Sequence, residues 1–135
     1  MNPPNYPQVA LDFMNRDHAE FAALRQKLLD LLAGEVSTPT VDGALAELGE
    51  HTRRHFSDEE QVMRETGFPV YEIHKGEHDR VLAEITMQVE RWMQGRDALA
   101  LRDWLDRAVG TWLVEHVSSM DFVTAAFAEK KLRKV

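Results

Sequence analysis

Histidines and carboxylates recur in this chain at spacings that an α-helix would bring to one side. Only six histidines occur in 135 residues, and five of them belong to this pattern. Residues four apart on a helix differ by about 40° around the axis and by about 6 Å along it, so two such side chains can hold one ion or two adjacent ions. The candidate metal ligands are His18, His55, Glu59, His74, His78, His116 and Asp121.

Apolar residues at intervals of three and four predict four amphipathic helices. We expect them from about residue 9 to 33, from Asp42 as a possible N-cap to Thr66, from about Val70 to Met93, and from Asp97 to at least Asp121, with an apolar helical tail beyond. Residues 37–40 are expected to form a loop. Short connections between helices of similar length favour antiparallel neighbours. The expected fold is therefore all-α: an up-down-up-down four-helix bundle over residues 9–135, preceded by an extended leader over residues 1–8.

The composition argues against several classes of protein. A net charge of −7 disfavours binding to nucleic acid or to an anionic membrane surface. The absence of cysteine excludes disulfides, thiolate zinc sites and iron–sulfur clusters. The first residues have neither a basic region nor an apolar run, and no apolar stretch is long enough to span a membrane. We expect a cytoplasmic protein without a nucleic-acid or membrane partner.

Each predicted helix carries at least one ligand-type residue on an apolar face. Burying these groups without partners would cost several kcal/mol for each charged one, and bound metal would remove that cost. Seven ligands exceed the four of tetrahedral zinc and suit two ions of iron, manganese or zinc. The set is rich in histidine and lacks the Glu-x-x-His motif of ferritin-like di-iron proteins. Neutral ligands favour the lower oxidation state of iron, which points to reversible binding rather than oxygenation.

Three segments resemble the hemerythrin family, specifically its single-domain bacterial form. They are His55-Phe56-x-x-Glu59-Glu60-x-x-Met63, His74-Lys75-x-Glu77-His78 and Trp112-Leu113-x-x-His116-x4-Asp121. The resemblance implies two non-haem iron ions with an oxo or hydroxo bridge, which bind dioxygen reversibly. It assigns His74, His78 and His116 to one iron. It assigns His18 and His55 to the other iron, which keeps one position open, and it makes Glu59 and Asp121 bridging ligands.

The same resemblance implies a dry pocket for dioxygen, or for azide or nitric oxide as analogues. Its walls would be apolar residues within one turn of the ligands, namely Phe21, Phe56, Trp112, Leu113 and Val117. Phe21 stands where the family usually has a leucine. We therefore expect a narrower pocket and slower entry of ligands.

Two positions do not fit a simple helical pattern. His51 forms a second His-x3-His with His55, but it lies about 12 Å from Glu59 along the helix, too far to share one compact site. We expect His51 to be an ordinary, partly exposed residue, or at most a partner of a ligand. Five residues separate His116 from Asp121 and rotate an α-helix by about 140°. Either Asp121 reaches the site from the side, or the helix contains a local bulge.

The expected function is reversible dioxygen binding for storage, delivery or scavenging, without enzymatic activity. One alternative is a sensor of oxygen, nitric oxide or redox state that uses the same site through a partner protein. Another is a di-iron enzyme with peroxidase-like or nitric-oxide-reducing activity. A non-redox zinc or manganese protein is a further possibility. Outside the expected site, we expect the acidic run Asp58-Glu59-Glu60 to be solvated apart from Glu59.

Overall fold

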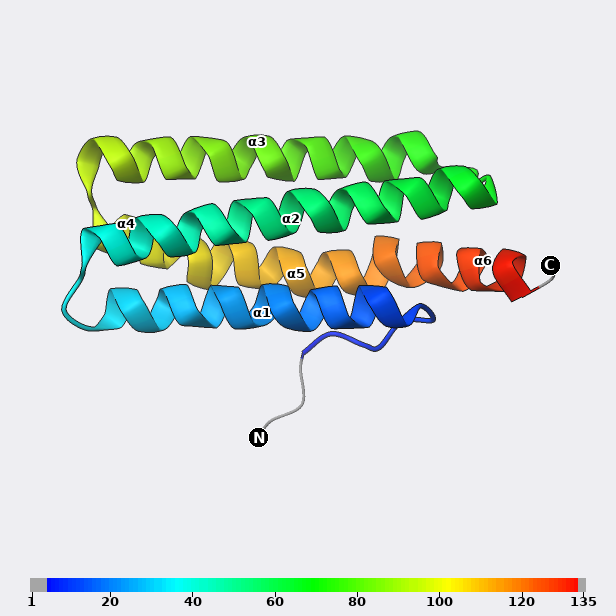
Figure 1. Ribbon diagram of the computed structural model, residues 1–135, viewed down its shortest axis with the longest axis horizontal. Helices are drawn as coiled ribbons and strands as arrows, with labels where there is room; N and C mark the ends of the chain where they lie inside the picture. Colours follow the sequence, from blue (N-terminus) through cyan, green and yellow to red (C-terminus); the bar gives the residue numbers. More distant parts are fainter. Residues whose placement is uncertain (1–4, 134–135) are drawn as a thin grey trace.

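Long helices account for nearly all of residues 5–133, the part of the chain that the computed structural model describes. The first three are α1 (Asp12–Ala33), α2 (Thr38–Thr66) and α3 (Tyr71–Gly95). The fourth rod is continuous but composite: α4 (Ala98–Asp103), the π-helix η1 (Trp104–Val109), α5 (Gly110–His116), the π-helix η2 (Val117–Asp121) and α6 (Phe122–Arg133). The connections between rods alternate between the two ends of the bundle, so neighbours are antiparallel (Figure 1). This confirms the predicted four-helix bundle with its helical tail.

The predicted ends of the bundle are only partly covered by this structure. Residues 1–4 of the expected leader and residues 134–135 lie outside the described residues. The boundary between leader and bundle therefore stays a prediction. Within residues 5–133, no helix is both long and apolar enough to cross a membrane.

The prediction that residues 37–40 form a loop, with Asp42 as the N-cap, is wrong. Helix α2 begins at Thr38, after Ser37, and Pro39 lies in its first turn. Proline is tolerated there because the first backbone N–H groups of a helix have no partner within the helix. Asp42 instead accepts hydrogen bonds from Trp92 Nε1 at 2.7 Å and from Arg96 Nη1 at 2.6 Å, which tie the start of α2 to the end of α3.

The first helix also begins later than the sequence predicts. The Asn15 side chain forms hydrogen bonds with both the backbone N–H and the backbone carbonyl of Val9, at 2.8 and 2.9 Å. These bonds satisfy the backbone of Val9 outside a helix, and α1 begins at Asp12. Beyond the metal-ligand candidates, buried apolar residues from all four rods form the core, including Leu28, Leu45, Ile85 and Leu105.

The π-helix η1 was not predicted, and a contact from α1 supports it. Arg25 Nε donates to the carbonyl of Leu105 at 2.7 Å, and Arg25 Nη2 donates to the carbonyl of Asp106 at 3.0 Å. The guanidinium can approach the helix so closely because the neighbouring residue is Gly110. A Cβ at Gly110 would lie 2.7 Å from Arg25 Nη2.

Gly110→Ala should therefore destabilise the protein, although alanine normally stabilises a helix by about 1 kcal/mol relative to glycine. The methyl group would displace Arg25, and hydrogen bonds from a charged donor contribute about 1.5–3 kcal/mol each. We expect a net loss of about 1 kcal/mol or more in the free energy of unfolding, measured by denaturant titration. The control is Gly43→Ala in α2, where a Cβ meets no atom within 4 Å. A gain in stability for Gly110→Ala equal to that of the control would contradict this role of Arg25.

Candidate metal centre

The structure brings all seven sequence-predicted ligands together inside the bundle. Helix α1 supplies His18, α2 supplies His55 and Glu59, α3 supplies His74 and His78, α5 ends with His116, and η2 ends with Asp121. Their exposed fractions lie between 0 and 6 %. The cluster is therefore removed from bulk water, and each member needs a partner inside the protein.

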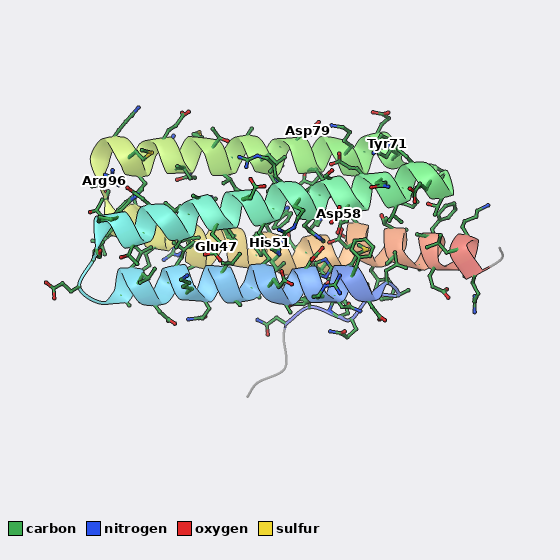
Figure 2. The ribbon with its side chains drawn as sticks, in the orientation of Figure 1. Glu47, His51, Asp58, Tyr71, Asp79 and Arg96 are labelled. Atoms are coloured by element: carbon green, nitrogen blue, oxygen red, sulfur yellow. The ribbon has the colours of Figure 1, made fainter. Side chains whose placement is uncertain are left out.

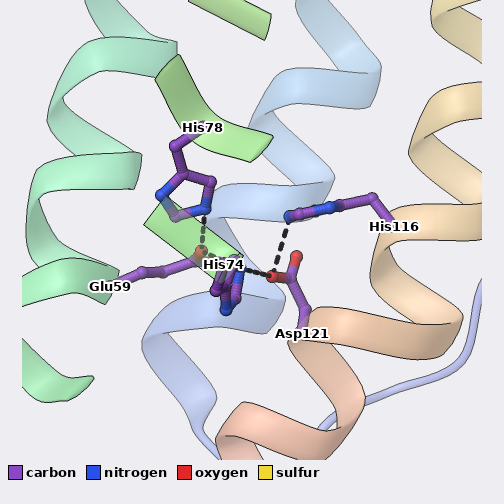
Figure 3. Close-up of side chains that lie close together, drawn as sticks. All are labelled: Glu59, His74, His78, His116 and Asp121. Atoms are coloured by element: carbon purple, nitrogen blue, oxygen red, sulfur yellow. Dashed lines mark ion pairs between the residues drawn. The ribbon is translucent and has the colours of Figure 1, made fainter. Parts of the chain in front are cut away.

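Two groups of potential ligand atoms lie side by side and share two residues. The first group is Glu59, His74, His78, His116 and Asp121, and the second is His18, His55, Glu59 and Asp121. Within each group, one ligand atom from every residue lies within 4.8 Å of all the others. Figure 3 shows the first group, with its imidazoles directed at the two carboxylates. The shared residues are the two carboxylates, which the resemblance to hemerythrin assigns as bridging ligands.

Each shared carboxylate presents one oxygen to each histidine group. Glu59 Oε1 lies 3.0 Å from His78 Nε2, while Glu59 Oε2 lies 2.7 Å from His55 Nε2. Asp121 Oδ1 lies 3.1 Å from His116 Nε2, while Asp121 Oδ2 lies 2.8 Å from His18 Nε2. This is the arrangement that two carboxylates need to connect two adjacent ions.

A π-helix explains the irregular spacing of His116 and Asp121. In η2 the Phe122 backbone N–H bonds to the carbonyl of Val117, five residues earlier. A turn of this width brings residues five apart to nearly the same side of the helix. Of the two alternatives left open by the sequence, the structure therefore has the local bulge.

Three ligand candidates have hydrogen-bond partners that the sequence analysis missed. His55 Nδ1 donates to Asp17 Oδ2 at 2.9 Å, and His78 Nδ1 donates to Glu60 Oε2 at 2.8 Å. His74 Nδ1 lies 2.8 Å from Thr124 Oγ1. Such contacts fix the orientation of the ring and direct the Nε2 lone pair toward the centre.

The expectation that Glu60 is solvated is wrong, because its side chain is only 15 % exposed and is bound to His78. Glu60 directly follows Glu59, so it lies on the flank of α2 that faces α3. The helical pattern of the sequence could have placed it there. Only the position of α3 identifies its partner.

Neighbouring charged and polar side chains shift the pKa values of two residues at the centre, Asp121 and His55. Burial would raise the pKa of Asp121, but the neighbouring imidazoles of His116, His18 and His74 outweigh burial and hold that pKa well below its ordinary value. Burial would lower the pKa of His55, but the Glu59 carboxylate and the hydrogen bond to Asp17 raise it to about 10. A raised pKa of this kind favours a protonated His55, whose positive charge offsets part of the negative charge that metal ions would otherwise balance.

The nitrogen and oxygen atoms at the centre are better placed to bind metal ions than to form hydrogen bonds with one another. Six atoms at the centre are buried and have no hydrogen-bond partner in the described part of the chain: both carboxylate oxygens of Glu59, Asp121 Oδ1, and Nε2 of His74, His78 and His116. Buried polar atoms are nearly always satisfied in a native protein. Imidazole nitrogen and carboxylate oxygen are ligands that iron, manganese and zinc accept. The unsatisfied atoms therefore mark the place where metal fits.

The five residues expected to line the pocket lie in different surroundings. Phe21 and Trp112 line a cavity of about 210 Å³, with their ring centroids 5.9 Å apart. Phe56 stacks on the ring of His78, with the centroids 3.8 Å apart. Leu113 and Val117 are buried but do not line this cavity. The walls nearest the histidines are thus aromatic rings, and the role of the five residues in ligand binding stays a prediction.

His51 does not belong to either group of ligand atoms at the centre. Its ring stacks beside that of His55, with the centroids 6.3 Å apart. The expectation of a partly exposed residue is wrong, because His51 is only 6 % exposed. It faces Glu20 of α1, with 3.2 Å between Nε2 and Oε2.

A four-helix bundle that buries a histidine-rich cluster around two shared carboxylates defines a class of non-haem metal protein. The family model described as "Hemerythrin HHE cation binding domain" matches residues 9–128. The chain therefore belongs to the hemerythrin family, as the sequence motifs predict. This family binds non-haem iron and dioxygen, and its members are oxygen-binding proteins rather than enzymes.

Curated relatives match over most of the chain. A bacteriohemerythrin of Aquifex aeolicus is 29 % identical over 125 residues, which cover 93 % of this chain and 95 % of that protein. A bacteriohemerythrin of Ralstonia nicotianae is 32 % identical over 78 % of this chain and 72 % of its own length. A myohemerythrin of Sipunculus nudus is 32 % identical over 62 % of each chain. No solved structure matches the chain.

Proposed function

We propose that the protein binds dioxygen reversibly at two non-haem iron ions joined by an oxo or hydroxo bridge. The observation that carries this proposal is the orientation of Glu59 and Asp121, each of which presents one oxygen to either histidine group. Two adjacent ions could each bind one oxygen of both carboxylates, whereas a single ion would leave the second oxygen of each carboxylate without a metal. Matches to bacteriohemerythrins over nearly the whole chain also support it.

The two groups differ in the number of ligands, which suggests where dioxygen binds. His74, His78 and His116 face one position, while only His18 and His55 face the other. The second position therefore has fewer protein ligands and leaves room for a small molecule. Ferrous iron supplies the electrons that dioxygen takes up on binding.

The residues around the centre would keep water and anions away from it. The rings of Phe56 and Trp112 stack on His78 and His116, with centroids 3.8 and 4.7 Å apart. Apolar, closely packed walls of this kind are typical of small-molecule sites. They favour exchange of dioxygen over entry of competing anions, which is what reversible binding requires.

Metal analysis together with an absorption spectrum tests the proposal. Protein produced with ample iron should contain about two irons per chain, as expected for seven ligands with two shared carboxylates. In air it should show the near-ultraviolet bands of an oxo-bridged di-iron centre, and azide should change them. A single tetrahedral zinc ion, or no metal after production with ample iron, would refute the proposal.

Repeated exposure to oxygen distinguishes binding from turnover. A reversible carrier should release dioxygen under vacuum and regain its deoxygenated spectrum over several cycles. An enzyme would consume a reductant in proportion to the oxygen supplied. A sensor would share the reversible spectrum but bind a partner protein in only one state. Storage, delivery or scavenging as the particular role, and the cytoplasm as its location, stay predictions.

Phe21→Leu should speed the binding of azide to the oxidised protein. Phe21 follows His18 by one turn of α1 and lines the cavity with Trp112. A leucine would widen this space, at a cost of up to about 1.5 kcal/mol in stability. Stopped-flow absorbance measures the rate of binding.

The control is Phe68→Leu, since Phe68 is also buried but packs against Phe127 in α6. Equal rates for both variants and for the wild type, with unchanged iron content, would show that Phe21 serves only as packing.

A further inference from the structure

A second cluster of metal-ligand side chains lies outside the buried centre, between α1 and α2. Asp17 and Glu20 of α1 and His51 of α2 each place one potential ligand atom within 4.8 Å of the other two. Figure 2 labels His51 on α2, the helix from which it faces Glu20. The centre described above uses neither His51 nor Glu20.

His51 is deeply buried and forms few hydrogen bonds, as expected for a histidine that could bind a metal ion. It is 94 % buried, and its only hydrogen bond among the described residues joins Nε2 to Glu20 at 3.2 Å. Its Nδ1 atom is buried and has no hydrogen-bond partner within residues 5–133. A buried imidazole with a single hydrogen bond can become a metal ligand without losing another one, since a cation would enter between it and Glu20.

The cluster contains one solvent-exposed side chain and two largely buried ones. The side chain of Glu20 is 45 % exposed, whereas that of Asp17 is only 13 % exposed. Glu20 lines two surface hollows, one shared with His51 and the other with Asp17. A hydrated cation can therefore reach the three side chains directly from solvent, whereas the ligand candidates of the buried centre are at most 6 % exposed.

The local charge favours a cation. The two hollows that Glu20 lines contain six carboxylates and three cationic side chains, a net charge of −3 with His51 neutral. The carboxylates are Asp17, Glu20, Glu47, Glu50, Asp58 and Glu65, and the cations are Arg16, Lys27 and Arg54. One imidazole and two carboxylates suit Zn²⁺ or Fe²⁺, with water in the remaining positions.

We propose that Asp17, Glu20 and His51 form a third divalent-cation site, separate from the buried centre and open to solvent. Asp17 connects the two sites, because its Oδ2 atom accepts the hydrogen bond from His55 Nδ1. The two oxygens of this carboxylate allow it to hold His55 and a cation together. The site would take a borderline metal such as Zn²⁺ or Fe²⁺.

Equilibrium dialysis of the iron-loaded protein against Zn²⁺ tests this proposal. The wild type should bind one zinc per chain in a saturable manner while it keeps its iron. Glu20→Gln should weaken zinc binding by roughly ten-fold or more, as loss of a group that supports a metal typically does. His51→Gln should have a similar effect. The matched control is Glu47→Gln, because Glu47 lines the same hollow but does not belong to the cluster.

Absence of saturable zinc binding in the wild type would overturn the proposal. Equal affinity in Glu20→Gln and the wild type would also overturn it. Glu20 is a surface residue, so its variant should fold even if His51→Gln does not. The iron content, measured before and after dialysis, reports on the buried centre separately. Failure of the di-iron proposal and failure of the third site are therefore distinguishable.

Discussion

Glu59→Ala should remove most of the iron from the purified protein. Glu59 is completely buried, and its two oxygens face His78 on one side and His55 on the other. The substitution removes one ligand from each of two adjacent positions, together with a negative charge that offsets the metal. We expect the iron content to fall from about two per chain to well below one, because loss of a metal's supporting groups alone costs 10–100-fold in affinity. Elemental analysis of protein purified with ample iron measures this loss.

Glu50→Ala provides the matched control, since Glu50 is an exposed glutamate on the same helix. It should keep the wild-type iron content. His51→Ala should also keep the iron of the buried centre, because His51 is absent from both ligand groups. If Glu59→Ala retained two irons, the two positions would not depend on a shared carboxylate and the arrangement proposed for the centre would be wrong.

The helices and the histidine pattern could be predicted because both are local features of the sequence. An amphipathic helix repeats every three or four residues, and ligands such as His74 and His78 repeat at the same interval. The start of α2 was misjudged because proline suggests a loop, although the first turn of a helix accepts it. These errors changed helix ends but not the faces that the helices bury.

Features that depend on two distant segments could not be predicted. The partners of His55, His78 and His74 lie 38, 18 and 50 residues away in the chain. Their identity follows only from how the helices pack. The π-helix η1 similarly depends on Arg25 of α1, which binds two of its carbonyls. The bulge at η2 was one of two alternatives, because only the need to place both His116 and Asp121 at the centre indicated it.

Removal of iron should lower the midpoint of thermal unfolding by more than about 10 °C. Metal that binds only the folded state stabilises it by about 4 kcal/mol when its concentration is a thousand times the dissociation constant. In a domain of this size, each kcal/mol shifts the midpoint by roughly 3–5 °C. The iron-free protein must instead balance its buried carboxylates with protonated imidazoles, including His55, whose pKa is raised to about 10. Circular dichroism of the iron-loaded and iron-free protein measures the shift.

Two comparisons connect this stabilisation to the buried centre. Anaerobic addition of Fe²⁺ should restore the original midpoint of unfolding, because the folded protein supplies the ligands and metal binding stabilises the folded state. Glu59→Ala should unfold at nearly the same temperature before and after iron removal, since it has little iron to lose. Coincident unfolding curves for the loaded and iron-free wild type would mean that the histidines and carboxylates satisfy one another without metal. The six unpartnered atoms at the centre argue against that outcome, because unsatisfied polar groups in a buried site cost about 1–3 kcal/mol each.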